Sequence, residues 1–237
     1  MRRVPTFVDG LDEVLEGGVP AGSVVLVSGA PGTMKTSLTF NVLHHNARRG
    51  TKGVYVSLEQ SRESLLEHTA GLGLRLEEAG GNLSVLDLAA LRKKLPDPQG
   101  QPWLDLFKFY AVGLKKTFDY KVLVIDSLDA LEILAKFRDV RRDVFGLIAW
   151  LRSLECTAFL LAELASEVTE DPVQRTSFAT HKEEYLADGI WHLRMVKQGQ
   201  FGIQRQLRVV KMRGTRHDTS YHALVFEDGF RVTRIMM

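Results

Sequence analysis

The residues with the clearest chemical signature are eight consecutive ones, namely Gly29, Ala30, Pro31, Gly32, Thr33, Met34, Lys35 and Thr36. They match the phosphate-binding pattern G-x-x-x-x-G-K-[ST], except that Met34 stands where the last glycine belongs. The N–H groups of such a loop, and the positive end of the helix dipole behind it, bind phosphates. We therefore predict that this loop, continued by Ser37, binds ATP, with Lys35 on the β- and γ-phosphates and the Thr36 hydroxyl on Mg²⁺.

Met34 is the one departure from the phosphate-loop pattern. If its backbone adopts a positive φ, the Cβ carries a penalty of about 1 kcal/mol or somewhat more. That penalty is small compared with the binding energy of a triphosphate. We therefore expect nucleotide binding to be retained, and the turnover rate to be the quantity that Met34 affects.

Two carboxylates follow predicted strands and suit the same chemistry. Asp126 ends the apolar run 122–125, where a carboxylate can hold Mg²⁺ beside Thr36. Many parallel strands end in Asp, so this signal is strong only because a phosphate loop precedes it; the alternative is a helix-capping residue. Glu59 follows the run 54–58 and can orient and deprotonate an attacking water, whereas the alternative is a solvated loop residue.

A basic stretch lies near the C-terminus of the chain. Residues 189–217 contain no Asp or Glu but seven Lys or Arg, namely Arg194, Lys197, Arg205, Arg208, Lys211, Arg213 and Arg216. The stretch has three interpretations: a solvated strand face, a nucleic-acid patch, or a cationic element aimed at a phosphate. The period of a strand puts Lys211 and Arg213 on one face, which suits a γ-phosphate clamp, but spacing alone leaves the three open.

The elements that must position these residues alternate along the chain. Continuous apolar runs at 24–27, 54–58, 83–87, 122–126 and 158–162 alternate with helical spacing at 37–43, 61–70, 103–116 and 144–154. This alternation predicts a mostly parallel sheet flanked by helices. From Ile190 the strands follow one another closely, with a hairpin turn at residues 227–229, which predicts a C-terminal antiparallel extension. The proline-rich residues 92–102 are expected to form a surface loop.

Composition limits the remaining classes of protein. The 237 residues, of which 45% are hydrophobic, suffice for one sizeable core, and we expect a single α/β domain over residues 1–237. A net charge of +2 does not by itself indicate nucleic acid or membrane. The single cysteine, Cys156, excludes an internal disulfide and is expected to be a buried thiol. Because no apolar run reaches 18 residues and no apolar signal core follows Met1, we expect a cytoplasmic protein.

Taken together, the motifs resemble those of the KaiC-like ATPases, which are related to RecA and RadA. Residues 10–18 are similar to the family's G-L-D-x-x-L-x-G-G signature, and residues 211–217 to its K-x-R-G-T-x-H strand end. Between them, in family order, lie the phosphate loop and the segments 57–61, 125–127 and 183–188. The resemblance covers about residues 6 to 232.

The resemblance implies a RecA-like P-loop ATPase core that assembles into a ring, usually a hexamer, with ATP at each subunit interface. It assigns Glu59 as the catalytic carboxylate, and it places Lys211 and Arg213 on the γ-phosphate of a neighbouring subunit, with His217 close by. Two departures, Met34 and Gln60 in place of a second glutamate, bear on the hydrolysis rate more than on binding, so slow turnover is expected.

The leading hypothesis is a homo-oligomeric, Mg²⁺-dependent ATPase that acts as a switch for an unidentified protein partner. A RecA-like DNA-binding protein is the first alternative. It is not favoured, because loop 164–184 has five acids against two bases, a net charge of −3, although residues 136–142 are basic. An autokinase is not expected, because Glu184 and Tyr185 stand where the resemblance places phosphorylatable residues. A ring that binds ATP with little turnover is the third alternative.

Overall fold

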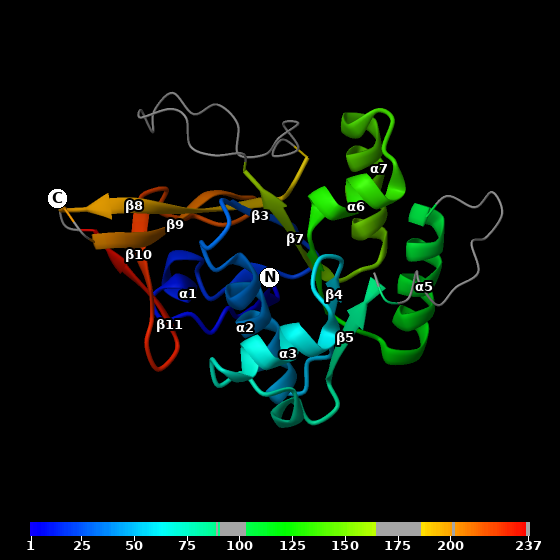
Figure 1. Cartoon of the computed structure of the whole chain (residues 1–237), viewed down its shortest axis with the longest axis horizontal. Coiled ribbons are helices and arrows are strands. Elements are labelled where there is room, and N and C mark those ends of the chain that lie inside the picture. The colour runs from blue at the N-terminus through cyan, green and yellow to red at the C-terminus, as the bar shows by residue number, and fades with distance from the viewer. Residues whose placement is uncertain (89, 91–102, 165–185, 201, 236–237) are drawn as a thin grey trace.

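The computed structural model describes residues 1–88, 90, 103–164, 186–200 and 202–235 (Figure 1). Its centre is a nine-stranded sheet with the order β11-β10-β9-β8-β3-β7-β6-β4-β5. Parallel pairing joins the strands from β8 across to β5, and antiparallel pairing joins β8 to β11. The strands are β3 Val24–Gly29, β4 Gly53–Ser57, β5 Leu83–Asp87, β6 Val122–Asp126, β7 Thr157–Glu163, β8 Gly189–Gln198, β9 Gly202–Met212, β10 Tyr221–Phe226 and β11 Phe230–Arg234.

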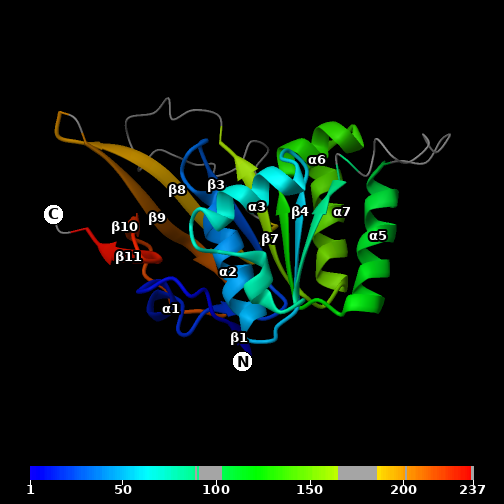
Figure 2. The same cartoon turned by 60° about the horizontal axis from the view of Figure 1, so that its bottom comes forward.

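Helices cover both faces of the parallel part of the sheet (Figures 1 and 2). They are α1 Leu11–Val14, α2 Lys35–Arg48, α3 Arg62–Ala70, α5 Trp103–Phe118, α6 Leu128–Ala135 and α7 Val140–Ser153, with a 3-10 turn at Leu76–Ala79. A short pair of strands, β1 Arg3–Val4 and β2 Val19–Pro20, lies outside the main sheet. Within the described residues, no helix combines the length and the apolar character needed to cross a bilayer.

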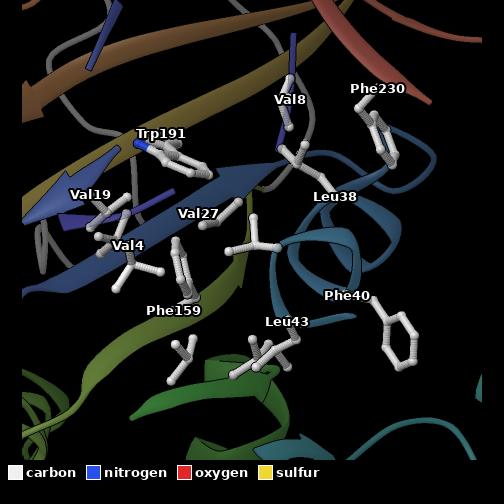
Figure 3. Close-up of a cluster of buried hydrophobic side chains, with 14 of the residues drawn as sticks. Val4, Val8, Val19, Val27, Leu38, Phe40, Leu43, Phe159, Trp191 and Phe230 are labelled. Atoms are coloured by element: carbon white, nitrogen blue, oxygen red, sulfur yellow. The ribbon is translucent and has the colours of Figure 1, made fainter. Parts of the chain in front are cut away.

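The apolar runs form strands because both faces of the sheet are buried, in two separate cores. Along β3, Val25 and Val27 pack into the core beneath α2, whereas Val24 and Leu26 pack into the core beneath α5, α6 and α7. Figure 3 shows the first core, in which Val27 of β3 lies among side chains from distant elements, Trp191 included. Because β3 is wholly buried, it is a rigid base for the loop that follows it.

The glycine-rich signature at residues 10–18 packs the N-terminal segment against β11 near the C-terminus. The Asp12 carboxylate accepts hydrogen bonds from the N–H groups of Thr6 (2.7 Å) and Phe7 (3.2 Å). Gly10 has a φ of 79°, and a Cβ there would lie 2.5 Å from the Val232 carbonyl oxygen of β11. Only glycine fits this close approach, so Gly10 of the signature serves to pack the N-terminal segment against β11.

The predicted strands and helices are confirmed, with shifts of a few residues at their ends. Helix α3 begins within the predicted range 61–70, and Ser61 caps it by accepting a hydrogen bond from the Ser64 N–H. Helix α7 begins at Val140, four residues before its predicted start, because Asp139 caps it there. Helix α6 is absent from the predicted elements. The predicted surface loop at 92–102, residues 165–184 of the acidic loop 164–184, and Tyr185 lie outside the described residues.

Candidate functional site

The phosphate-loop pattern forms the predicted strand, loop and helix. Strand β3 ends at Gly29, where a Cβ would lie 2.5 Å from the Leu193 carbonyl oxygen, and α2 begins at Lys35. Met34 precedes that helix in the left-handed region, with φ 73° and ψ 27°. The residue therefore carries the strain that a glycine would avoid, and its partly buried side chain packs against the core beneath α2.

Lys35 lies beneath the loop rather than in solvent. Its Nζ donates hydrogen bonds to the carbonyl oxygens of Gly29 (2.7 Å) and Ala30 (3.2 Å). Burial lowers the pKa of the Lys35 ammonium, and nearby carboxylates, Glu163 first, oppose that shift. The side chain thus comes from the first turn of α2 to the loop that would hold the phosphates.

The two predicted metal ligands are adjacent in space. The Thr36 hydroxyl donates to Oδ2 of Asp126 at 2.8 Å, from the first turn of α2 to the end of β6. Burial raises the pKa of Asp126, and hydrogen bonds from Tyr55 and Thr36 oppose the shift. A hydroxyl and a carboxylate are oxygen donors of the kind that Mg²⁺ prefers, so the residues present fit that ion.

Tyr55 joins this pair from the interior of the sheet, and sequence reasoning missed it. Its ring is fully buried on β4, 5.6 Å from the ring of Phe40, and its hydroxyl donates to Oδ2 of Asp126 at 2.5 Å. A tyrosine within an apolar strand is typical of a core residue, so the sequence holds no signal for this bond.

Glu59 stands at the exposed end of a turn that follows β4. The Ser127 hydroxyl donates to Oε1 of Glu59, which ties this carboxylate to the residue after Asp126. The turn is closed at its base, because the Ser57 hydroxyl donates to the Gln60 carbonyl oxygen at 2.7 Å. Glu59 is therefore accessible yet held in place, as a group that acts on a bound water must be.

One cavity of about 320 Å³ brings these groups together. It is lined by residues 31–37 of the loop and α2, and by Glu59, Gln60, Asp126, Ser127 and Glu163. Glu163, at the end of β7, was not predicted as part of a site; its N–H donates to the Asp129 carboxylate at 2.7 Å. Three carboxylates face one ammonium in this cavity, so a divalent cation would improve its charge balance.

Lys211, Arg213 and His217 lie elsewhere. The Lys211 ammonium donates to the Ala187 carbonyl oxygen at 2.7 Å, and the Arg213 guanidinium to Oδ1 of Asp188 at 3.1 Å. Oδ2 of Asp188 in turn accepts from the Val24 N–H, at the opposite end of β3 from the phosphate loop. His217 lines a separate cavity next to α1.

A strand, phosphate loop and helix, with the acid of a parallel strand beside the loop threonine, define a P-loop protein with a RecA-like core. A model of the family described as "ATPase: KaiC" matches residues 4–235. The chain therefore belongs to the KaiC family of ATPases, which makes it an ATP-binding P-loop ATPase by family.

Curated relatives of the chain include circadian clock oscillator proteins KaiC. The one from a Picosynechococcus species is 30% identical over 98% of this chain and 44% of its own length. The one from Parasynechococcus marenigrum is 31% identical over 92% of this chain and 42% of its own. The chain thus spans less than half the length of these relatives.

A solved structure matches along its whole length. It is that of a KaiC-like protein from the hyperthermophilic archaeon Pyrococcus horikoshii, with a TM-score of 0.81 and 26% identity. The match covers 98% of this chain and 99% of that one. The predicted fold, a mostly parallel sheet flanked by helices with an antiparallel C-terminal extension, is confirmed.

Proposed function

We propose that the chain hydrolyses Mg²⁺-bound ATP at a site shared between two copies of itself. The observation that carries the proposal is the separation of Lys211 and Arg213 from the phosphate loop of the same chain. Both cations bond to residues 187 and 188, which lie beside the start of β3, whereas the loop follows its end. Cations at that place act on a phosphate only if it belongs to another copy.

The length of the strand makes this separation quantitative. Strand β3 has six residues, so its ends are roughly 17 Å apart. A fully extended arginine side chain does not cover that distance, and the guanidinium of Arg213 is already held by Asp188. A neighbouring copy that placed its β9 end over this chain's loop would supply the missing positive charge, with its His217 close by.

Within one chain, the proposed roles follow from position. Lys35 and the loop N–H groups bind the β- and γ-phosphates, and Thr36 with Asp126 holds Mg²⁺. The ion, when bound, neutralises charge on the phosphates during transfer. Glu59 orients the attacking water and accepts its proton, while the neighbour's Lys211 and Arg213 stabilise charge on the γ-phosphate. The catalytic groups are then Lys35, Glu59, Lys211 and Arg213.

The assembly is proposed to be a ring, a hexamer by the family resemblance, that acts as an ATP-dependent switch for a protein partner. ATP bound between copies would stabilise the ring by linkage, so assembly is expected to depend on nucleotide. The clock activity in the relatives' names is theirs, and this chain spans less than half of them.

Mixing two inactive variants tests the shared site. Lys35→Ala removes the cis lysine, and Lys211→Ala with Arg213→Ala removes the trans pair. In an equal mixture, roughly a quarter of head-to-tail interfaces would join an intact loop to an intact cation pair. We expect ATPase activity above that of either parent, measured on protein sized by light scattering. A mixture no more active than its parents would show that the cations do not act in trans.

A further inference from the structure

Two hydroxyl groups donate to one oxygen of Asp126. Thr36 approaches Oδ2 from the cavity side at 2.8 Å, and Tyr55 approaches the same atom at 2.5 Å from the core beneath α2. Within the described part of the chain, no hydrogen bond to the other oxygen, Oδ1, is observed. The two bonds therefore fix the rotation of the carboxylate and define which oxygen is occupied by protein donors.

Tyr55 reaches Asp126 because of the sheet order. Strands β4 and β6 are parallel neighbours, with Tyr55 opposite Val124 and Ser57 opposite Asp126. Tyr55 is therefore the diagonal neighbour of Asp126 on the same face, one step further into the core. It does not line the phosphate cavity, whereas Asp126 does. The phenol thus supports the carboxylate from behind.

The ring and the hydroxyl of Tyr55 have separable tasks. The ring is packed in the core beside Phe40, and this packing would hold it without the hydroxyl. The hydroxyl is buried, and leaving it without a partner would be costly. Its partner is an almost wholly buried carboxylate, so the bond is charge-assisted and gives the hydroxyl the acceptor that it needs.

We propose that Tyr55 is a positioning residue for the magnesium site, whose hydroxyl holds the Asp126 carboxylate in the orientation that lets Thr36 and Asp126 bind the ion together. The inference rests on the proposed function. Groups that orient metal ligands from behind typically change metal affinity tenfold to a hundredfold when removed. Tyr55 itself contacts neither nucleotide nor metal in this scheme.

Tyr55→Phe tests the proposal, because it keeps the ring and removes only the hydroxyl. Tyr120→Phe is a matched control: Tyr120 is equally buried, and its hydroxyl donates to the Ala111 carbonyl oxygen at 3.1 Å in the other core. The probes are Mn²⁺, followed by electron paramagnetic resonance on the ATP-loaded protein, and ATP itself, titrated in Mg²⁺ and in EDTA.

We expect Tyr55→Phe to weaken Mn²⁺ binding by roughly tenfold to a hundredfold while ATP affinity in EDTA stays within about twofold. Tyr120→Phe should change neither quantity. A folded Tyr55→Phe protein that binds Mn²⁺ as wild type does, or more tightly, overturns the proposal. So does an equal weakening in both variants, which would reduce Tyr55 to a buried hydroxyl like any other.

A second measurement needs no metal and covers the case of poor folding. The coupling free energy between Tyr55→Phe and Asp126→Asn, taken from urea unfolding in EDTA, reports the bond itself, and a coupling of zero overturns the proposal. Failure of the proposed function looks different, because wild-type protein would then bind ATP equally in Mg²⁺ and in EDTA. If wild type gains affinity from Mg²⁺ and Tyr55→Phe gains as much, only the positioning role is wrong.

Discussion

The Thr36 hydroxyl and the Asp126 carboxylate, 90 residues apart in the chain, are joined by a 2.8 Å hydrogen bond. Because the threonine hydroxyl donates this hydrogen bond, the lone pairs of its oxygen stay available to a cation. Asp126→Asn removes the charge but keeps the size of the side chain. We expect it to weaken the Mg²⁺-dependent part of ATP binding at least tenfold, or about 1.4 kcal/mol. Titrations in Mg²⁺ and EDTA measure this, and an equal loss in both would show that Asp126 shapes the loop instead.

Glu59→Gln should abolish hydrolysis and leave ATP affinity nearly intact. Glutamine still accepts the hydrogen bond from Ser127, so the turn should keep its position, but it cannot take a proton from water. An interaction made only in the transition state lowers kcat without weakening binding. Single-turnover ATPase and equilibrium binding, measured side by side, separate the two effects. Parallel loss of binding and turnover would assign Glu59 a structural role.

Met34→Gly should raise turnover or ATP affinity by less than about tenfold. The left-handed backbone at Met34 is an ordinary conformation for glycine, so strain is relieved, while the partly buried methionine contact is lost. Steady-state ATPase and ring size, measured on the same preparation, test this. Loss of ATP binding altogether would contradict the strain account, because glycine removes strain at this position.

Asp188→Asn should lower the free energy of unfolding at pH 7 by about 2 kcal/mol, as expected when a network of bonds to a charge is broken. Burial raises the pKa of Asp188, but hydrogen bonds from Arg152, the Val24 N–H and Arg213 outweigh it and lower the pKa. A folded pKa below the unfolded value near 3.8 gives stability that is present above that value and lost as the pH falls through the folded pKa.

Urea unfolding of both proteins at pH 7 and near pH 3 measures this prediction. The difference in the free energy of unfolding between wild type and Asp188→Asn should be smaller near pH 3 than at pH 7. The control is Asp119→Asn, an exposed residue paired with Lys121 in a left-handed turn that asparagine tolerates, and its effect on the free energy of unfolding should be small at both pH values. If this difference were the same at both pH values, the charge of Asp188 would not contribute to the stability of the fold.

Cys156 should react slowly with thiol reagents at pH 8. The residue is buried, and burial raises the pKa of its thiol to about 11. Only roughly one thiol in a thousand is then ionised, and the thiolate is the reactive form. Cys156 precedes β7, at the end of the strand remote from the cavity of the same chain. Fast labelling of folded protein would show that this end of the sheet opens.

Much of this fold follows from local pattern. The apolar runs, the helical spacing at 61–70 and the turn at residues 227–229 each depend on neighbours in sequence, and each was placed to within a few residues. Helix α6 was not predicted, since its apolar residues follow the apolar strand β6 almost without a break. Its start is marked only by Ser127, which accepts a hydrogen bond from the Ala130 N–H.

The grouping of Lys35, Thr36 and Asp126 in one cavity was predictable because residue type and motif coincide there, whereas their roles stay predictions. The site was not predictable where strand order decides. Glu163 enters the cavity because β7 lies between β3 and β6, and Tyr55 meets Asp126 because β4 lies beside β6. The spacing of residues along the chain predicts neither of these strand pairings. Whether the whole of residues 1–237 behaves as one domain stays a prediction.

The central position of β3 also constrains how the molecule forms. The strand that carries the phosphate loop is made early, but its pairing partners are made late. The N–H of Gly22 bonds to Thr157, 135 residues onward, and the N–H of Val24 bonds to Asp188, 164 residues onward. Neither edge of this apolar strand can therefore pair until most of the chain has been synthesised. We expect slow folding, as is typical of high contact order. We also expect the nascent segment to be prone to aggregation until β7 and β8 have been synthesised.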